Sequence, residues 1–257
     1  MAKIAWQGLT LPILLLALPF AASAQDAATV LQPTAEALRV AEVRTLRLVA
    51  SGSGYAPRSD EQEAQPAVTE TAAGTVDPSS PMFVPPPPPP KRSYYRIISQ
   101  VQSLDLAAGS MSIEQVRAES SAPDAERSGP EVTSIDASAD WSERHRYWLT
   151  PHAFVAGALA GGASVGTETV SGVEYRVVSL TVDGGHEVRG YVDPDDRLVR
   201  VRTTVEDPDG GTTDVIESFF DWGDRGELTF PSTLIRKENG ELAEVLVVKE
   251  IDASTAG

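Results

Sequence analysis

Residues Val173 to Glu206 read VEYRVVSLTVDGGHEVRGYVDPDDRLVRVRTTVE. Three stretches of alternating apolar and polar residues, 173–182, 186–192 and 197–206, are separated by Asp-Gly-Gly and Asp-Pro-Asp-Asp. A period of two residues is typical of a strand with one buried face, and Asp, Pro and Gly are the residues that tight turns favour. This stretch therefore predicts three consecutive antiparallel strands.

The same pattern continues toward the C-terminus. Strand-like stretches cover 213–222, 228–237 and 242–251, and Asn239-Gly240 separates the last two. Asn-Gly between two apolar runs is the strongest short signal for a hairpin. Six strands joined by tight turns form an antiparallel meander. The predicted fold class is therefore mainly β (α+β), a curved antiparallel sheet or half-barrel with one or two short helices packed on it.

The N-terminal half gives weaker signals. Residues 33–42 have a helical composition, and residues 43–55 predict the first strand. Further strands are predicted over 91–106, 112–120 and 141–150, the last with aromatic residues at its ends.

One helix is predicted over 150–160, within the sequence WLTPHAFVAGALAGGA of residues 148–163. Thr150 suits the N-cap, Pro151 suits the first helical position, and Gly161-Gly162 ends the helix. Its small residues would let the helix lie close against the concave face of the sheet, as a lid. The residues predicted to face inward are Phe154, Ala158 and Leu159.

The first 24 residues have the layout of a secretory signal peptide. Lys3 supplies a positive charge, residues 9–20 form an apolar core, and Ala22 and Ser23 lead to the expected cleavage between Ala24 and Gln25. We therefore expect a periplasmic or secreted protein. The apolar core is shorter than the about 20 residues that a membrane span needs, so we expect no integral membrane protein after cleavage.

An acidic, proline-rich insertion covers residues 56–90 and ends in six consecutive prolines, Pro85 to Pro90. Its few apolar residues cannot offset the entropy of ordering the segment, and the proline run favours an extended polyproline conformation. We expect a disordered spacer. The β domain then begins in 25–55, and its main part covers 91–257.

Charge and cysteine content exclude several kinds of partner and chemistry. The chain has 21 Lys and Arg against 37 Asp and Glu, a net charge of −16 at pH 7. This balance repels nucleic acid and anionic membrane surfaces. The sequence contains no cysteine, which excludes disulfides and thiolate chemistry.

The sequence contains no recognisable catalytic or metal-binding motif. His145, His152 and His186 lack the spacing of a zinc site. The acidic turns lack the ligand spacing and the closing Glu of a calcium loop, and no serine lies in a nucleophile elbow. No carboxylate pair stands out among the 37 acidic residues. We therefore assign no catalytic residue, no metal ligand and no cofactor, and we expect a protein that is not an enzyme.

Three stretches carry a resemblance to a known module: WLTPHAFVAGALA (148–160), VSLTV to FFDW (178–222) and LTFPSTLIRKENGELAEVLVVKEI (228–251). They resemble the N-terminal β-rich module of exported bacterial metallo-β-lactamase-fold hydrolases, in which a Trp-x-Thr-Pro-x-x-Phe segment and a strand running into Phe-Pro precede the zinc domain. The His-x-His-x-Asp-His motif of that domain is missing here, so no zinc ligand carries over. The succession of long antiparallel strands with one or two helices is also similar to the LolA-type half-barrels of periplasmic lipoprotein carriers, whose known members cradle acyl chains between a curved sheet and lid helices.

Two functional hypotheses follow. The first is a non-catalytic periplasmic binding module whose cleft holds a lipid, another apolar or acyl ligand, or an envelope protein partner. The second is the N-terminal accessory domain of a zinc-dependent metallo-β-lactamase-fold hydrolase whose catalytic domain is missing from this chain. The residues predicted to line an apolar cleft are Trp148, Phe154, Tyr175, Phe219 and Phe220. Core packing is the alternative role for these aromatic side chains.

Overall fold

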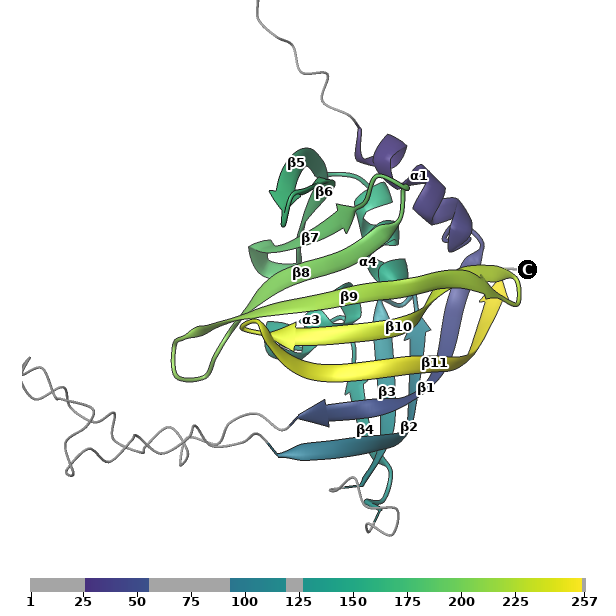
Figure 1. The fold of residues 1–257 in the computed structure, drawn as a ribbon, viewed down its shortest axis with the longest axis vertical. Helices are drawn as coiled ribbons and strands as arrows, with labels where there is room; N and C mark the ends of the chain where they lie inside the picture. Colours follow the sequence, from purple (N-terminus) through teal and green to yellow (C-terminus); the bar gives the residue numbers. More distant parts are fainter. Residues whose placement is uncertain (1–25, 56–92, 119–126, 256–257) are drawn as a thin grey trace, which may run out of the picture.

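The computed structural model describes residues 26–55, 93–118 and 127–255, which form one curved sheet of eleven antiparallel strands and three short helices (Figure 1). The predicted signal peptide at 1–24, its cleavage site at Ala24 and Gln25, and the insertion at 56–90 lie outside the described residues. The helices and strands are α1 (Ala27–Ala37), β1 (Val43–Tyr55), β2 (Tyr94–Asp105), β3 (Ser110–Ala118), β4 (Glu131–Ile135), α3 (Trp141–Trp148), α4 (Pro151–Leu159), β5 (Ser164–Val170), β6 (Val173–Val182), β7 (His186–Val192), β8 (Leu198–Glu206), β9 (Thr212–Arg225), β10 (Leu228–Glu238) and β11 (Glu241–Thr255).

The first and last strands pair with each other inside the sheet. The strand order is β4-β3-β2-β1-β11-β10-β9-β8-β7-β6-β5, so the β1–β11 pair joins two meanders. The chain passes from β4, at one edge, to β5, at the other edge, through α3 and α4. This connection has to cross one face of the sheet. Figure 1 shows the sheet curving around α3 and α4, which therefore cover its concave face.

The predicted C-terminal meander is confirmed. Its six strands correspond to β6 to β11, and each pairs with the next in antiparallel register. In the last turn Asn239 and Gly240 have φ values of 50° and 79°. Positive φ at both central residues is the geometry of the hairpin that Asn-Gly favours. The predicted curved antiparallel sheet with short helices packed on it is confirmed as well.

The strand predicted over 141–150 is wrong, because Trp141–Trp148 forms helix α3. Asp140, in an extended conformation, precedes the helix. The buried side chains of α3 are Arg144, His145 and Tyr147, a spacing that fits one face of a helix and does not alternate as in a strand. The aromatic residues at both ends of this segment favoured a strand. They are partly buried because the helix packs on the sheet, and this tertiary contact cannot be predicted from the local sequence.

Three other elements differ from the sequence prediction. Helix α1 begins after Asp26, six residues before the predicted range 33–42, and contains Pro33 within it. The edge strands β4 and β5 were not predicted. None of the residues of β5 is fully buried, so its sequence lacks the alternation that marks the other strands. Leu159, predicted to face inward, is 37% exposed at the end of α4.

Helix α4 packs closely on the sheet. The Thr150 hydroxyl accepts a hydrogen bond from the Ala153 backbone N–H, with 3.4 Å between Oγ1 and N, which confirms Thr150 as the N-cap. Phe154 and Ala158 are buried. A Cβ on Gly190 of β7 would lie 2.2 Å from the Phe154 ring. The close packing of α4 on the sheet therefore depends on Gly190 in β7 as well as on the small residues of the helix.

His152 connects α4 to the end of α1. Its fully buried imidazole donates a hydrogen bond from Nε2 to the Leu38 carbonyl oxygen, 3.0 Å away, since a carbonyl can only accept. The ring stacks on Phe230, with 5.8 Å between the centroids. Burial lowers the pKa of His152 to about 4, so the side chain is neutral at pH 7. These contacts give His152 a structural role.

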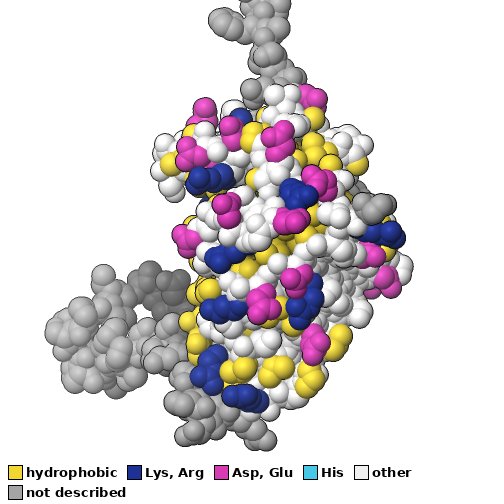
Figure 2. Space-filling model, turned by 90° about the vertical axis from the view of Figure 1, so that its right-hand side faces the viewer, with side chains coloured by type: hydrophobic (Ala, Val, Ile, Leu, Met, Phe, Trp, Pro, Cys, Tyr) yellow, Lys and Arg dark blue, Asp and Glu magenta, His cyan; other side chains and the backbone are white. Residues whose placement is uncertain are grey.

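The surface seen in Figure 2 carries basic and acidic side chains mixed with one another and with hydrophobic ones. Neither sign of charge forms a continuous patch on this face. None of the helices in the described ranges is long and apolar enough to cross a membrane.

The pairing of β1 with β11 depends on a close approach at Gly52. A Cβ on Gly52 would lie 1.8 Å from the Val245 carbonyl oxygen in the backbone of β11. The register of β1 against β2 also shifts between Ala50 and Gly52. A side chain at position 52 would therefore force the two central strands apart.

We expect the substitution Gly52→Ala to lower the free energy of unfolding by about 2–4 kcal/mol, because the backbone of β11 cannot move without disturbing the ladder. Urea unfolding followed by circular dichroism measures this change. Gly166→Ala in β5 is the matched control, since no atom lies within 4 Å of a Cβ there. Equal losses for the two variants would show that the β1–β11 approach is not critical.

Candidate functional site

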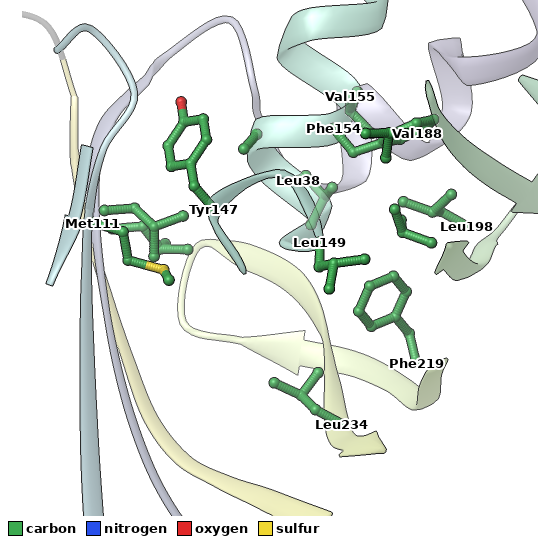
Figure 3. Packing of buried hydrophobic residues seen from close by; sticks show 14 of the residues in the cluster. Leu38, Met111, Tyr147, Leu149, Phe154, Val155, Val188, Leu198, Phe219 and Leu234 are labelled. Atoms are coloured by element: carbon green, nitrogen blue, oxygen red, sulfur yellow. The ribbon is translucent and has the colours of Figure 1, made fainter. Parts of the chain in front are cut away.

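The concave face of the sheet and the junction of α3 with α4 enclose a space that we call the inner cavity. Its volume is about 40 Å³, which suffices for a water molecule or two. Leu149 at the helix junction points toward Phe219 of β9 and Leu234 of β10, and Met111 of β3 lines the opposite side (Figure 3). Further apolar side chains in its wall are Leu46, Leu48, Leu104, Ile113, Phe230 and Leu246.

A larger space, the outer cleft, adjoins the inner cavity. Its volume is about 840 Å³, within the range of about 300–1,000 Å³ that is common for small-molecule sites. Arg146 of α3 and Arg236 of β10 line both spaces. Other residues that line the outer cleft include Tyr94, Tyr95, Arg117, Glu131, His145 and Glu238. The two arginines therefore mark the junction between an apolar interior and a polar, partly aromatic opening.

A row of charged side chains crosses the sheet at this junction. Arg236 is paired with Glu217 of β9 on one side and with Glu244 of β11 on the other. Residues directly opposite one another in antiparallel strands project from the same face. All three line the inner cavity, so they lie on the concave face. Arg236 Nη2 lies 3.2 Å from Glu244 Oε1.

Glu244 is buried and well supplied with hydrogen-bond donors. Its side chain is 5% exposed, and Oε2 accepts a hydrogen bond from Gln115 Nε2 at 3.4 Å. Gln115 also donates to Gln100 and accepts from Arg117 Nε. Burying a carboxylate is costly unless it is paired, and these contacts supply Glu244 with a cation and a hydrogen-bond donor.

Tyr95 extends the row across β1 to β2. Glu244 is paired with Gly54 of β1, and Gly54 is paired with Tyr95. A Cβ on Gly54 would lie 2.3 Å from the Tyr95 ring, so the ring covers the glycine on the side of Glu244. Arg117 lies over the same ring, 4.7 Å from its centroid. Burial raises the pKa of the Tyr95 phenol, and the charge of Glu244 raises it further.

Arg146 and Glu217 differ from the Arg236–Glu244 pair because neither makes a hydrogen bond or a close ion pair with the residues that the structure describes. Within the described ranges, no carboxylate lies within 4.0 Å of the Arg146 guanidinium, and its N–H groups make no hydrogen bond. Burial lowers the pKa of Arg146 to about 10, with a smaller effect from Arg236. Burial raises the pKa of the half-buried Glu217 to about 7, against the opposing charge of Arg236. Arg146 is therefore a cation at pH 7, whereas Glu217 changes its charge near this pH.

The three histidines lie apart from this row or are neutral within it. His145 lines the outer cleft, and burial lowers its pKa to about 4. His186 stacks on Trp141, with 4.3 Å between the ring centroids. The part of the chain that the structure describes contains no group of three or more His, Cys, Asp or Glu residues that could hold a metal ion.

The structure distributes the five predicted cleft residues over several places. Phe219 lines the inner cavity, and Phe154 is buried in the core between α4 and the sheet. The half-buried Trp148 donates a hydrogen bond from its indole N–H to Asp183, 2.8 Å away. The remaining two are Tyr175, half-buried against Tyr191, and Phe220, which is 47% exposed. Phe219 is therefore the one member of this set that lines either space.

The charged residues of the site were not predicted from the sequence, although two of them stand out in the alternation of apolar and polar residues. Glu217 stands between Val215 and Phe219 at inward positions of β9. Glu244 likewise precedes Leu246 on the buried face of β11. A charged residue at an inward position of an otherwise apolar alternation is unusual, because burying it requires a partner.

Comparison with known proteins gives only distant similarities. No family model matches this chain, and no curated protein matches it. Solved structures similar to it include a LolA superfamily protein from Nitrosomonas europaea, with a TM-score of 0.44, 10% identity and coverage of 90% of this chain and 95% of that chain. A second is an outer membrane lipoprotein-sorting protein domain from Vibrio parahaemolyticus, with a TM-score of 0.41, 8% identity and coverage of 88% of this chain and 93% of that chain. A third is a DUF1329 family protein from Desulfovibrio piger, with a TM-score of 0.38, 8% identity and coverage of 89% of this chain and 93% of that chain. Scores this low carry no argument about function, so the site is interpreted from its own residues.

We expect Arg236→Met to lower the free energy of unfolding by about 2–4 kcal/mol at pH 8, because it leaves the buried Glu244 without its cation. The loss should shrink at pH 5.5, because burial raises the pKa of Glu217 to about 7, so that this carboxyl is protonated there and no longer needs the cation. Urea unfolding at both pH values measures it. The control is Arg47→Met, which removes an exposed pair to Asp252 with 3.4 Å between Nη1 and Oδ2 and should cost less than about 1 kcal/mol. Equal, pH-independent losses in both variants would contradict this account.

Proposed function

We propose that the protein is an exported, non-catalytic binding module that holds an amphiphilic molecule between the concave face of the sheet and the α3–α4 lid. The apolar part of the ligand occupies the inner cavity, and its polar part lies in the outer cleft. The observation that supports this most directly is that Arg146 and Arg236 line both spaces. An apolar space bounded by charged side chains that also line a polar cleft matches the two ends of an amphiphile.

The size of the inner cavity implies that the lid moves when the ligand binds. At about 40 Å³ the cavity is far smaller than an acyl chain, so the helix junction at Leu149 has to move away from Phe219 and Leu234. An apolar chain would replace the contacts that these side chains make with one another. Apolar surface therefore stays buried in both states, and this keeps the free-energy difference between them small.

Export and location belong to the same proposal. They rest on the signal-like sequence of residues 1–24 and the expected cleavage between Ala24 and Gln25. After cleavage the protein would be periplasmic or secreted, where lipids and lipid-modified envelope proteins are available as ligands.

The two alternatives have less support. An envelope protein segment could occupy the outer cleft, but the buried charges at the junction suit a ligand with one ionic end better than a continuous peptide. The hypothesis of an accessory domain of a metallo-β-lactamase-fold hydrolase rests on sequence resemblance alone, and the comparisons with known proteins do not support it.

We expect the wild-type protein to bind the uncharged fluorescent probe N-phenyl-1-naphthylamine, and Met111→Phe to weaken binding at least about tenfold by filling the inner cavity. Met111→Ala enlarges the same cavity and should bind the probe as tightly as the wild type or more tightly. Both variants disturb the core, so their opposite effects separate cavity volume from loss of stability. Fluorescence titration measures the affinities.

Val132→Phe is the matched control, because Val132 lies on neighbouring strand β4 and is 62% exposed. Its probe affinity should equal that of the wild type. The proposed function fails if the wild-type protein does not bind the probe, or if Met111→Phe binds it unchanged.

A further inference from the structure

We propose that the ligand carries an anionic head group, such as a phosphate, sulfonate or carboxylate, which Arg146 and Arg236 bind at the junction of the inner cavity and the outer cleft. This inference rests on the proposed function and specifies the chemistry of its ligand. It assigns the charged row beneath α3 a role in recognition in addition to its role in the core.

The position of the two arginines supports this assignment. They are the two residues that line both spaces among those described. An amphiphile with its tail in the inner cavity and its head in the outer cleft would therefore pass between them. The inner cavity also shares Leu46, Leu104 and Met111 with a neighbouring surface depression. These three side chains are apolar and have no hydrogen-bond donor or positive charge for an anion.

Both guanidinium groups have unused hydrogen-bond donors at this junction. Arg146 makes no hydrogen bond and no close ion pair within the described ranges. Arg236 uses Nη2 for Glu244, and its buried Nε makes no hydrogen bond, only a looser ion pair with Oε1 of Glu238, 3.6 Å away. Buried donors such as this Nε are nearly always paired in folded proteins, and Arg146, which is half-buried and lines the outer cleft, adds further free donors beside it. An oxyanion between the two side chains would supply the acceptors, with the forked geometry that arginine favours.

The charge balance of the row depends on Glu217. The charged groups that face it are Arg236 and Glu238 on β10, Glu244 on β11 and Arg146 on α3. Its partner on β8 is the uncharged Val201. Protonation of the Glu217 carboxyl removes one negative charge from this group, so the surroundings of Arg146 and Arg236, which Glu244 and Glu238 oppose, become more positive by one unit.

The protonation state of Glu217 should therefore set the affinity for the anion. Burial raises the pKa of this carboxyl to about 7. Below that pH the carboxyl is neutral and leaves Arg146 available to the ligand. Above it the carboxylate offsets the charge of Arg236 and, less strongly, that of Arg146, and it repels the head group. Binding of an anion should consequently be stronger at pH 6 than at pH 8, and it should be accompanied by proton uptake.

The test compares ligands that share a dodecyl chain and differ in the head group. Displacement of N-phenyl-1-naphthylamine is measured below the micelle concentration for dodecyl sulfonate, 1-dodecanol and dodecyltrimethylammonium. At pH 7 the sulfonate should bind about tenfold more tightly than the alcohol, and the cation more weakly than either. Sulfonate keeps its charge between pH 6 and pH 8, so any pH dependence belongs to the protein.

Two variants assign the effect to residues. In Arg146→Gln the ratio of sulfonate to dodecanol affinity should fall to about one, whereas Arg47→Gln, on the surface, should retain the wild-type ratio. The wild-type sulfonate affinity should fall about three- to tenfold from pH 6 to pH 8, and Glu217→Gln should remove this change. An unchanged ratio in Arg146→Gln would overturn the inference.

The outcomes separate the head group from the site itself. Equal displacement by all three ligands would overturn the anionic head group and leave the proposed function intact. Failure of all three to displace the probe would overturn the proposed function. Inorganic phosphate at the same concentration should not displace the probe. If it does, the arginines bind a free anion, and the inference that they recognise an amphiphile is wrong.

Discussion

The pairing of β1 with β11 is the constraint on which the rest of the structure depends. It places the first and last strands inside one sheet and leaves β4 and β5 at its two edges. The chain between those edges has to cross the sheet, and it does so as α3 and α4. A lid over the concave face is therefore a consequence of strand order. The close approach at Gly52 keeps the two central strands in contact.

The same arrangement explains why charges occur in the core. Helix α3 brings Arg146 over the strands on which Glu217, Arg236 and Glu244 stand side by side. A core made only of apolar residues would be more stable, since a buried ion pair gains little over hydrophobic packing. Half-buried arginines with unused donors at the boundary of an apolar cavity are better explained by recognition than by stability.

Local sequence patterns predicted the elements that carry their own signals. Strands β6 to β11 alternate in polarity and are bounded by turn residues, and α4 has a recognisable N-cap in Thr150. Strand β5 lies at an edge without a fully buried residue, and α3 owes its burial to tertiary contacts, so neither was predicted. The inward charges of Glu217 and Glu244 were visible in the alternation. Glu217 and Glu244 lie beside Arg236 because of the register of the hairpins, and Arg146 lies over them because the chain crosses the sheet between β4 and β5. Neither the register nor the crossing can be predicted from a local sequence pattern.

Native mass spectrometry of the protein, purified without detergent from its natural host, tests the central claim most directly. The account predicts a mass above that of the polypeptide alone, with an excess that organic extraction removes and that corresponds to an amphiphile with an acidic group. The mass of the bare chain under the same gentle conditions, before and after extraction, would contradict it.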